Sequence, residues 1–348
     1  MSASEPLTRF GRIYPPDEVW LTKQAPEPIL DPDLPIIDPH HHLWDRPNHR
    51  YLLDDFLADV RTGHNIVATV FEECHTMYRS SGPEELRPVG ETECIAGITA
   101  KSASGLQGPT RVAAGIVGFA DLTLGDRVEP VLEALIRAGD GRFRGVRHSA
   151  GWDVSEVIGN SRTAIGPHLL RQPDFEAGLA RLTALGLSFD AWLYHPQLDD
   201  VIDLARAFPT TSIIMCHVGG PLGYGPYAGK KDEVFATWKI KITELATCPN
   251  VVMKLGGMIN RLAAYDYRAL PAPVSSAELA AHWRPYMETC IERFGPDRCM
   301  FESNFPVEKM GISWAVLWNA FKRIAAGAST EEKLALFSGT ARRAYRLA

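Results

Sequence analysis

Eight short apolar runs recur along the chain, and stretches with the apolar spacing of helices separate most of them. Runs of this length, followed by polar or turn residues, are typical of buried strands. They lie at residues 34–37, 65–73, 111–119, 143–148, 187–194, 211–217, 250–257 and 298–306. Strands that alternate with helices form parallel sheets covered by helices. Eight such units in 348 residues predict an α/β fold of the (β/α)8 type, a TIM barrel.

The two ends of the chain differ from this repeating pattern. Residues 1–33 are rich in proline and lack sustained periodicity, so we expect an extended arm packed on the barrel. Residues 34–348 then form a single barrel domain, which ends in two helices at 314–325 and 330–346. Trp314 and Trp318 lie on the first of these helices. We expect them to pack on the barrel, and a homodimer contact is the alternative.

Charge and cysteine content limit the partners and the compartment. The net charge of -6 leaves no basic footprint for nucleic acid or an anionic membrane surface. We find no apolar run of transmembrane length and no signal-peptide core at the N-terminus. The six cysteines are scattered and form no Cys-x-x-Cys pair. They predict reduced, buried thiols in a cytoplasmic protein. The partner that we expect is a small-molecule substrate.

The first apolar run ends in Asp38-Pro-His40-His-His42. Side chains alternate along a strand, so Asp38, His40 and His42 are expected on one face. Two imidazoles at this spacing can bind one divalent metal ion from the same side. A solvated loop in which Asp38 caps a turn is the plainer alternative for an isolated pair of this kind.

Other predicted strands also end in ligand-type or ionisable residues. The carboxyl ends of barrel strands open onto one rim, where catalytic groups gather. These residues are Glu72 and Glu73, Arg147 and His148, His195, His217, and Glu302 with Asn304. Their number favours an active site at this rim over a chance occurrence of polar strand ends.

The ensemble resembles the amidohydrolase superfamily. The resemblance is to its amidohydrolase-related (amidohydrolase 2) branch, which includes sugar-lactone and pyrone-dicarboxylate lactonases and some decarboxylases. It covers nearly the whole chain from Pro35 onward. The matching motifs are Asp38-Pro-His40-His-His42-Leu-Trp, Gly-Val-Arg147-His, Tyr194-His195-Pro, Cys-His217-Val-Gly-Gly-Pro and Glu302-Ser-Asn304-Phe-Pro. It implies that His40, His42, His195 and His217 hold or flank a divalent metal, zinc or alternatively manganese.

The last motif departs from the family, in which an Asp before the aromatic-Pro pair binds metal and acts as general base. This chain has Asn304, which cannot take a proton from water but can offer its amide oxygen to a metal. Glu73 and Glu302 are the candidate bases, and His195 is a further catalytic candidate. We expect Thr69, Phe71 and Glu73 to face the barrel interior, which favours Glu73 over Glu72.

Four residues are predicted to bind substrate. Arg147 can hold a carboxylate through two hydrogen bonds, and an ion pair with a rim carboxylate is its alternative. Lys254 places a charge in an apolar strand, so it contacts substrate or pairs with Glu302. His148 lies at the rim. Tyr194 would be the inward group if the fifth strand has no bulge, and His195 if it has one.

These residues favour a metal-dependent hydrolase of a small carboxylated or hydroxylated substrate. The specific prediction is a lactonase that opens a cyclic ester. The alternatives are a non-oxidative decarboxylase of an aromatic or muconate-like acid, a metal-free lactonase, or a barrel that binds a small acid without turnover. Loops at 149–173 and 224–232 are expected to decide substrate choice.

Overall fold

The computed structural model describes residues 13–158, 166–259 and 265–348. Eight parallel strands form one sheet whose order follows the chain. They are β1 (Ile36–His41), β4 (Ile66–Glu72), β5 (Arg111–Gly118), β6 (Phe143–Arg147), β7 (Ser188–Ala191), β8 (Ile213–Met215), β9 (Val251–Leu255) and β10 (Cys299–Phe301). The sheet closes through a parallel bridge between His41 and Phe305, and the backbone N of Asn304 donates to the carbonyl of His40 at 2.8 Å. The predicted (β/α)8 barrel is confirmed.

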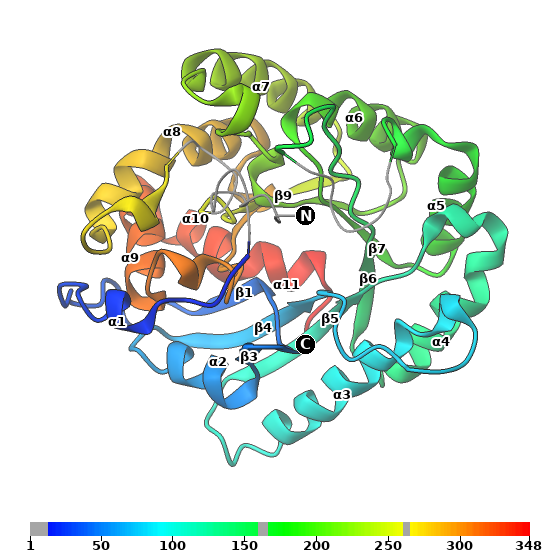
Figure 1. The fold of residues 1–348 in the computed structure, drawn as a ribbon, viewed down its shortest axis with the longest axis horizontal. Helices are drawn as coiled ribbons and strands as arrows, with labels where there is room; N and C mark the ends of the chain where they lie inside the picture. The colour runs from blue at the N-terminus through cyan, green and yellow to red at the C-terminus, as the bar shows by residue number, and fades with distance from the viewer. Residues whose placement is uncertain (1–12, 159–165, 260–264) are drawn as a thin grey trace, which may run out of the picture.

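Helices surround the barrel on its outer face (Figure 1). They are α2 (Leu53–Val60), α3 (Val89–Ala103), α4 (Glu129–Ala138), α5 (Pro173–Ala184), α6 (Leu198–Ala207), α7 (Lys231–Leu245), α8 (Ser276–Phe294) and α9 (Trp314–Ile324). Each turns an apolar stripe toward the strands; α4, for example, buries Val131, Leu132 and Leu135. No helix of the described residues is long and apolar enough to cross a membrane. All six cysteines are free thiols, and five of them are buried.

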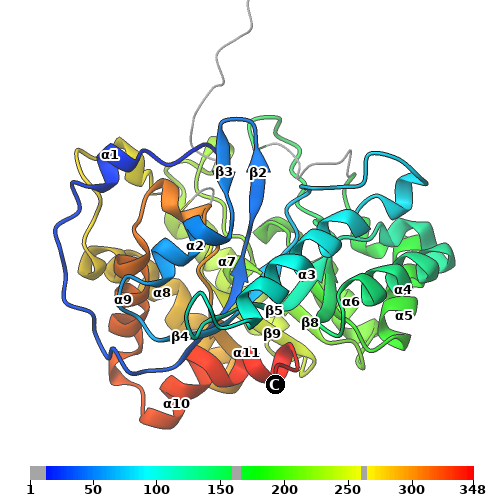
Figure 2. The same ribbon diagram turned by 90° about the horizontal axis from the view of Figure 1, so that it is seen from below.

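The two ends of the barrel are built differently. Figure 2 shows a hairpin of β2 (Trp44–Arg46) and β3 (His49–Tyr51) above one end, which is the end where β1 delivers its histidines. The opposite end is covered by α10 (Thr330–Leu334) and α11 (Thr340–Ala344) (Figure 2). We call α10 and α11 the C-terminal plug, because they close this end of the barrel. The rim where the strands end therefore lies at the other end, beneath the hairpin.

The interior residues of the strands correct one expectation. Ala68 and Val70 of β4 pack with Ile37, Ile214, Met300 and the C-terminal Tyr345, so they face into the barrel. Glu72 therefore also faces inward, and Thr69 faces outward, where its hydroxyl contacts His41. The prediction that Thr69 and Phe71 face inward was wrong, whereas Glu73, just beyond the end of β4, reaches Arg147 at the rim. Both faces of a barrel strand are apolar, so alternation alone cannot tell them apart.

The N-terminal arm contacts the late helices. The backbone N of Leu30 donates to Asn319 Oδ1 at 2.9 Å, and Lys322 Nζ donates to the Leu30 carbonyl at 2.7 Å. The division at residue 33 stays a prediction, and residues 1–12 lie outside the described chain. Trp314 and Trp318 are 1% and 0% exposed, so the suggested dimer contact through them is wrong. Their rings pack against each other and against neighbouring phenylalanines inside the chain.

Candidate active site

The end of β1 is tied to the segment after β10. Asp38 Oδ1 accepts a hydrogen bond from the backbone N of Ser303 at 2.9 Å, and Oδ2 accepts from the Ser303 hydroxyl at 2.6 Å. Burial raises the pKa of Asp38 to about 7. The pairing of β1 with β4 shifts register between Asp38 and His41, so strict alternation fails here. His41 packs on Phe56, with ring centroids 4.2 Å apart, while His40 and His42 reach the rim.

His42 presents an unprotonated nitrogen to the rim. Its Nδ1 lies 2.8 Å from the backbone carbonyl of Glu72. A carbonyl oxygen only accepts, so Nδ1 carries the proton in the neutral ring and Nε2 keeps its lone pair. Nε2 of His42 lies 3.2 Å from Nε2 of His40 and 3.3 Å from Oδ1 of Asn304.

His40 offers a second lone pair at the same place. Arg147 Nη1 lies 3.3 Å from His40 Nε2, and a guanidinium only donates, so Nε2 is unprotonated. Its Nδ1 lies 2.7 Å from Glu302 Oε2, an ion-pair distance at an angle outside that of an ordinary hydrogen bond. Burial, and next to it the charge of Lys254, lowers the pKa of His40 well below its usual value. The ring is therefore neutral at pH 7.

His217 is held by the same carboxylate. Glu302 Oε1 accepts from His217 Nδ1 at 2.7 Å and from its backbone N at 3.1 Å. These bonds support a left-handed backbone at His217, whose φ is 54°. The ring has room only because residue 257 is glycine: a Cβ there would lie 1.8 Å from His217 Nδ1. The His217 and His40 ring centroids lie 4.7 Å apart.

The spacing of these acceptor atoms fits a divalent metal ion. Two ligands of a tetrahedral zinc ion, each at about 2.0–2.1 Å, lie roughly 3.3–3.4 Å apart. The separations from His42 Nε2 to His40 Nε2 and Asn304 Oδ1, 3.2 and 3.3 Å, match this edge. His40, His217 and Glu302 also offer ligand atoms within 4.8 Å of one another. Glu302 lies 2.7 Å from Nδ1 of both His40 and His217, so it orients the two rings.

Glu73 and Arg147 form an ion pair at the rim. Arg147 Nε donates to Glu73 Oε1 at 2.8 Å, and Glu73 Oε2 lies 3.2 Å from His75 Nε2. The same guanidinium contacts His40, so Arg147 links Glu73 to the histidine cluster. The predicted alternative for Arg147, pairing with a rim carboxylate, is what the side chain does.

Lys254 lies below the histidines in a closed ionic cluster. Its Nζ donates to Glu72 Oε2 and to Asp190 Oδ2, both at 2.9 Å, and all three side chains are fully buried. The Tyr345 hydroxyl of the C-terminal plug donates to the same Asp190 oxygen. The suggested pairing of Lys254 with Glu302 was wrong, because the carboxylates of β4 and β7 take its place. A direct contact of Lys254 with substrate stays a prediction.

The hydrogen bonds described for His195 are with the backbone of other loops and not with the histidine cluster. It opens a short turn after β7; its Nδ1 accepts from the backbone N of Leu222 at 3.2 Å, and its own N donates to the Gly220 carbonyl at 2.8 Å. Burial lowers the pKa of His195 to about 4. Among the described residues, none of its contacts reaches His40 or His42. Its predicted roles in metal binding and catalysis stay predictions.

Tyr194 and His148 are buried behind the rim. Tyr194 packs edge-to-face on Trp192 with ring centroids 5.7 Å apart. His148 Nδ1 accepts from the backbone N of Leu122 at 3.2 Å, and burial lowers its pKa to about 4. Trp192 also packs edge-to-face on His217 at 4.7 Å, which makes it a wall of the site. Substrate contact by Tyr194 or His148 stays a prediction.

Sequence reasoning missed several residues that build the site. Asp190, Ser303 and Glu308 were not singled out, although all three are fully buried. Asp190 is an acidic residue within an apolar run, which is the same kind of sequence signal that singled out Lys254. Glu308 Oε1 lies 3.1 Å from Asn304 Nδ2, and burial raises its pKa to about 8. Residues 159–165 of the predicted specificity loop lie outside the described chain.

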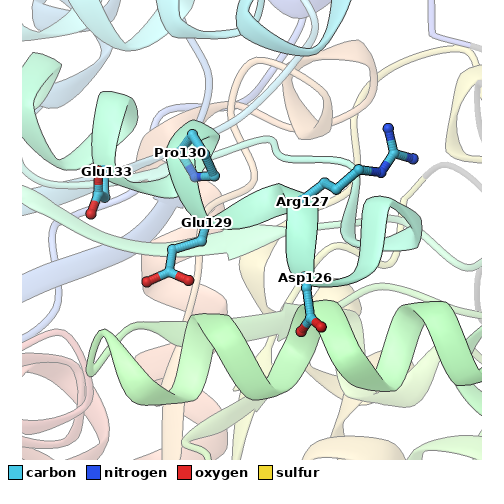
Figure 3. Close-up of a pocket in the computed structure, with 5 residues that line it drawn as sticks. All are labelled: Asp126, Arg127, Glu129, Pro130 and Glu133. Carbon is cyan, nitrogen blue, oxygen red and sulfur yellow. The ribbon is translucent and has the colours of Figure 1, made fainter.

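A separate hollow on the outer surface does not bear on this chemistry. It is lined by residues of α4 and the turn before it: Asp126, Arg127, Glu129, Pro130 and Glu133 (Figure 3). Arg127 points away from Glu129 and Glu133 (Figure 3). Arg181 pairs with Asp126 at 2.9 Å, so the acidic groups here form surface ion pairs.

Comparisons with known proteins agree with this geometry. A family model described as Amidohydrolase matches residues 37–347. A relative from Sinorhizobium fredii, the uncharacterized protein y4mH, is 32% identical and covers 90% of this chain and 99% of its own length. The L-fucono-1,5-lactonase of Burkholderia multivorans is 26% identical, over 89% and 96%. An amidohydrolase structure with bound zinc, from the same species, superposes with a TM-score of 0.69 at 24% identity, over 90% and 99%.

Proposed function

Because the chain belongs to the amidohydrolase family, as the match over residues 37–347 shows, we propose that it is a metal-dependent lactonase. Its substrate is a small cyclic ester of a hydroxylated acid, the class to which the substrate named for the Burkholderia relative belongs. Zinc is the metal that the ligand set fits first, with manganese second, since imidazole nitrogen and amide oxygen suit both. The predicted resemblance to this family is confirmed.

One observation carries the proposal. Nε2 of His42 lies 3.2 Å from Nε2 of His40 and 3.3 Å from Oδ1 of Asn304, while the ring proton of His42 points to the Glu72 carbonyl. Three acceptors this close repel one another unless a cation or a set of donors lies between them. Arg147 Nη1 lies 3.3 Å from His40 Nε2, and Lys254 Nζ lies 3.4 Å from His40 Nδ1. A divalent metal ion satisfies all three at once.

The chain's own residues divide the work around that ion. A bound metal polarises the ester carbonyl and lowers the pKa of a coordinated water. Glu302 accepts a hydrogen bond from His217 Nδ1 and lies 2.7 Å from His40 Nδ1, so it orients both rings toward the site. Glu73 accepts the proton of the attacking water, since Glu302 is enclosed by two imidazoles and residue 304 is neutral. Arg147 holds the Glu73 carboxylate beside His40.

The lyase alternative has less support from the charges. A decarboxylase must hold the carboxylate of its substrate, and two basic side chains contact His40. Both already have carboxylate partners: Arg147 is bonded to Glu73, and Lys254 to Glu72 and Asp190. These pairs favour a cyclic ester with hydroxyl groups over a free acid.

The test combines metal content with turnover. Protein purified without chelator is analysed by inductively coupled plasma mass spectrometry and assayed on sugar-acid 1,4- and 1,5-lactones with a pH indicator. The His40→Ala/His42→Ala variant is the deletion, and Lys101→Ala, whose side chain is 59% exposed on α3, is the surface control. We expect about one metal ion per chain and acid release in the wild type and the control, and neither in the deletion. Lactone hydrolysis that persists without metal would leave a metal-free lactonase instead.

A further inference from the structure

Asn304 bridges the histidine cluster and a buried carboxylate. Its Oδ1 lies 3.3 Å from His42 Nε2, and its Nδ2 donates to Glu308 Oε1 at 3.1 Å. Its backbone is fixed as well, because its N donates to the His40 carbonyl at 2.8 Å and its φ of 52° is one that asparagine tolerates. The side chain therefore has one remaining freedom, the exchange of amide oxygen and nitrogen.

Glu308 determines which of the two amide orientations Asn304 adopts. Its Oε2 accepts from the backbone N of Ile259 at 3.1 Å, so the carboxylate is anchored on the chain beyond β9. The oxygen that faces Asn304 also accepts, which matches the amide NH2 and opposes the amide oxygen. In the reversed orientation the NH2 group would donate to His42 Nε2 and occupy the lone pair that a metal needs.

From these contacts, and resting on the proposed metal site, we propose that Glu308 is a positioning residue. By accepting a hydrogen bond from the amide NH2, it turns the amide oxygen of Asn304 toward the metal. A hydrogen bond from Nδ2 to a carboxylate draws electron density toward Oδ1, which strengthens a neutral ligand.

The test exchanges the amide at position 304 and the carboxyl group at position 308, and it measures metal affinity. Glu308→Gln keeps the size of the side chain but lets its NH2 face Asn304, which favours the reversed amide. Asn304→Asp combined with Glu308→Gln returns the charge to position 304 and gives it a donor behind. Glu133→Gln is the matched control, because its side chain is 50% exposed on α4. Zinc dissociation constants of chelator-treated proteins are read by competition with a chromogenic chelator, and thermal unfolding without metal reports folding.

We expect Glu308→Gln to weaken zinc binding by about 10–100-fold, the usual effect of removing an outer partner of a ligand. The double variant should recover to within about threefold of the wild type, and the control should not change. Equal affinity of Glu308→Gln and wild type would overturn the proposal, as would a double variant that binds no better than the single one. If Glu308→Gln does not fold, the double variant decides alone. A wild type that binds no zinc or manganese would instead refute the proposed function itself.

Discussion

Replacing Lys254 by Met removes the cation that bridges two buried carboxylates, Glu72 and Asp190, and leaves Glu72 with the more distant Arg147 at 3.5 Å. Lys254 Nζ lies 2.9 Å from both Glu72 and Asp190, and all three are 0% exposed. Removing one partner of a buried ion pair costs about 3–5 kcal/mol, because a charge is left without compensation. For 348 residues that corresponds to a fall in Tm of about 4–7 °C.

The loss of stability in Lys254→Met must depend on pH. The pKa of Glu72 is raised to about 8, first by burial and then by Asp190, while Lys254 lowers it. Without Lys254 the pKa of Glu72 rises further. A carboxyl with a raised pKa in the folded state is tolerated while protonated, so stability is retained below its ordinary pKa of 4.5 and is lost as pH rises through the folded value. Lys254→Met should therefore be nearly wild-type in stability at pH 5 and most destabilised at pH 9.

Thermal unfolding followed by circular dichroism at pH 5, 7 and 9 measures this. Lys101→Met, on the surface with its side chain 59% exposed, is the control and should shift stability by less than about 0.5 kcal/mol. The triple change that adds Glu72→Gln and Asp190→Asn should recover most of the loss, because a neutral cluster leaves no charge unpaired. A loss that does not vary with pH, or no loss at pH 9, would refute the reasoning.

Two further changes probe the supports of the site. Gly257→Ala should abolish zinc binding while the chain still folds, because the new Cβ would lie 1.8 Å from His217 Nδ1 and force the ring away; unchanged metal content by mass spectrometry would contradict this. Tyr345→Phe removes the hydroxyl that donates to Asp190 and should lower the unfolding free energy by about 1–3 kcal/mol in urea titration, with zinc affinity unchanged. A Tyr345→Phe variant as stable as the wild type would mean that the plug does not support the ionic cluster.

Much of the fold could be predicted from the sequence, because a buried strand leaves a local pattern of apolar residues. Each of the eight strands is a short apolar run between turns, and each falls where the sequence predicted it. The hairpin of β2 and β3 was not predicted, since strands of three residues carry no periodicity. The direction in which β4 faces was predicted wrongly, because the helices outside the barrel and the plug inside it both demand apolar side chains.

The sequence by itself determined that histidines and carboxylates meet at one rim, because parallel strands in a closed barrel deliver their carboxyl ends to the same side. It determined the residue types at hand, including the neutral Asn304. Only the tertiary structure decided which groups pair: Lys254 with Glu72 and Asp190, Glu302 with two imidazoles, and Asn304 with Glu308. Those contacts join residues from 4 to 262 positions apart, and their energies depend on ångström distances in a buried site, which no local pattern encodes.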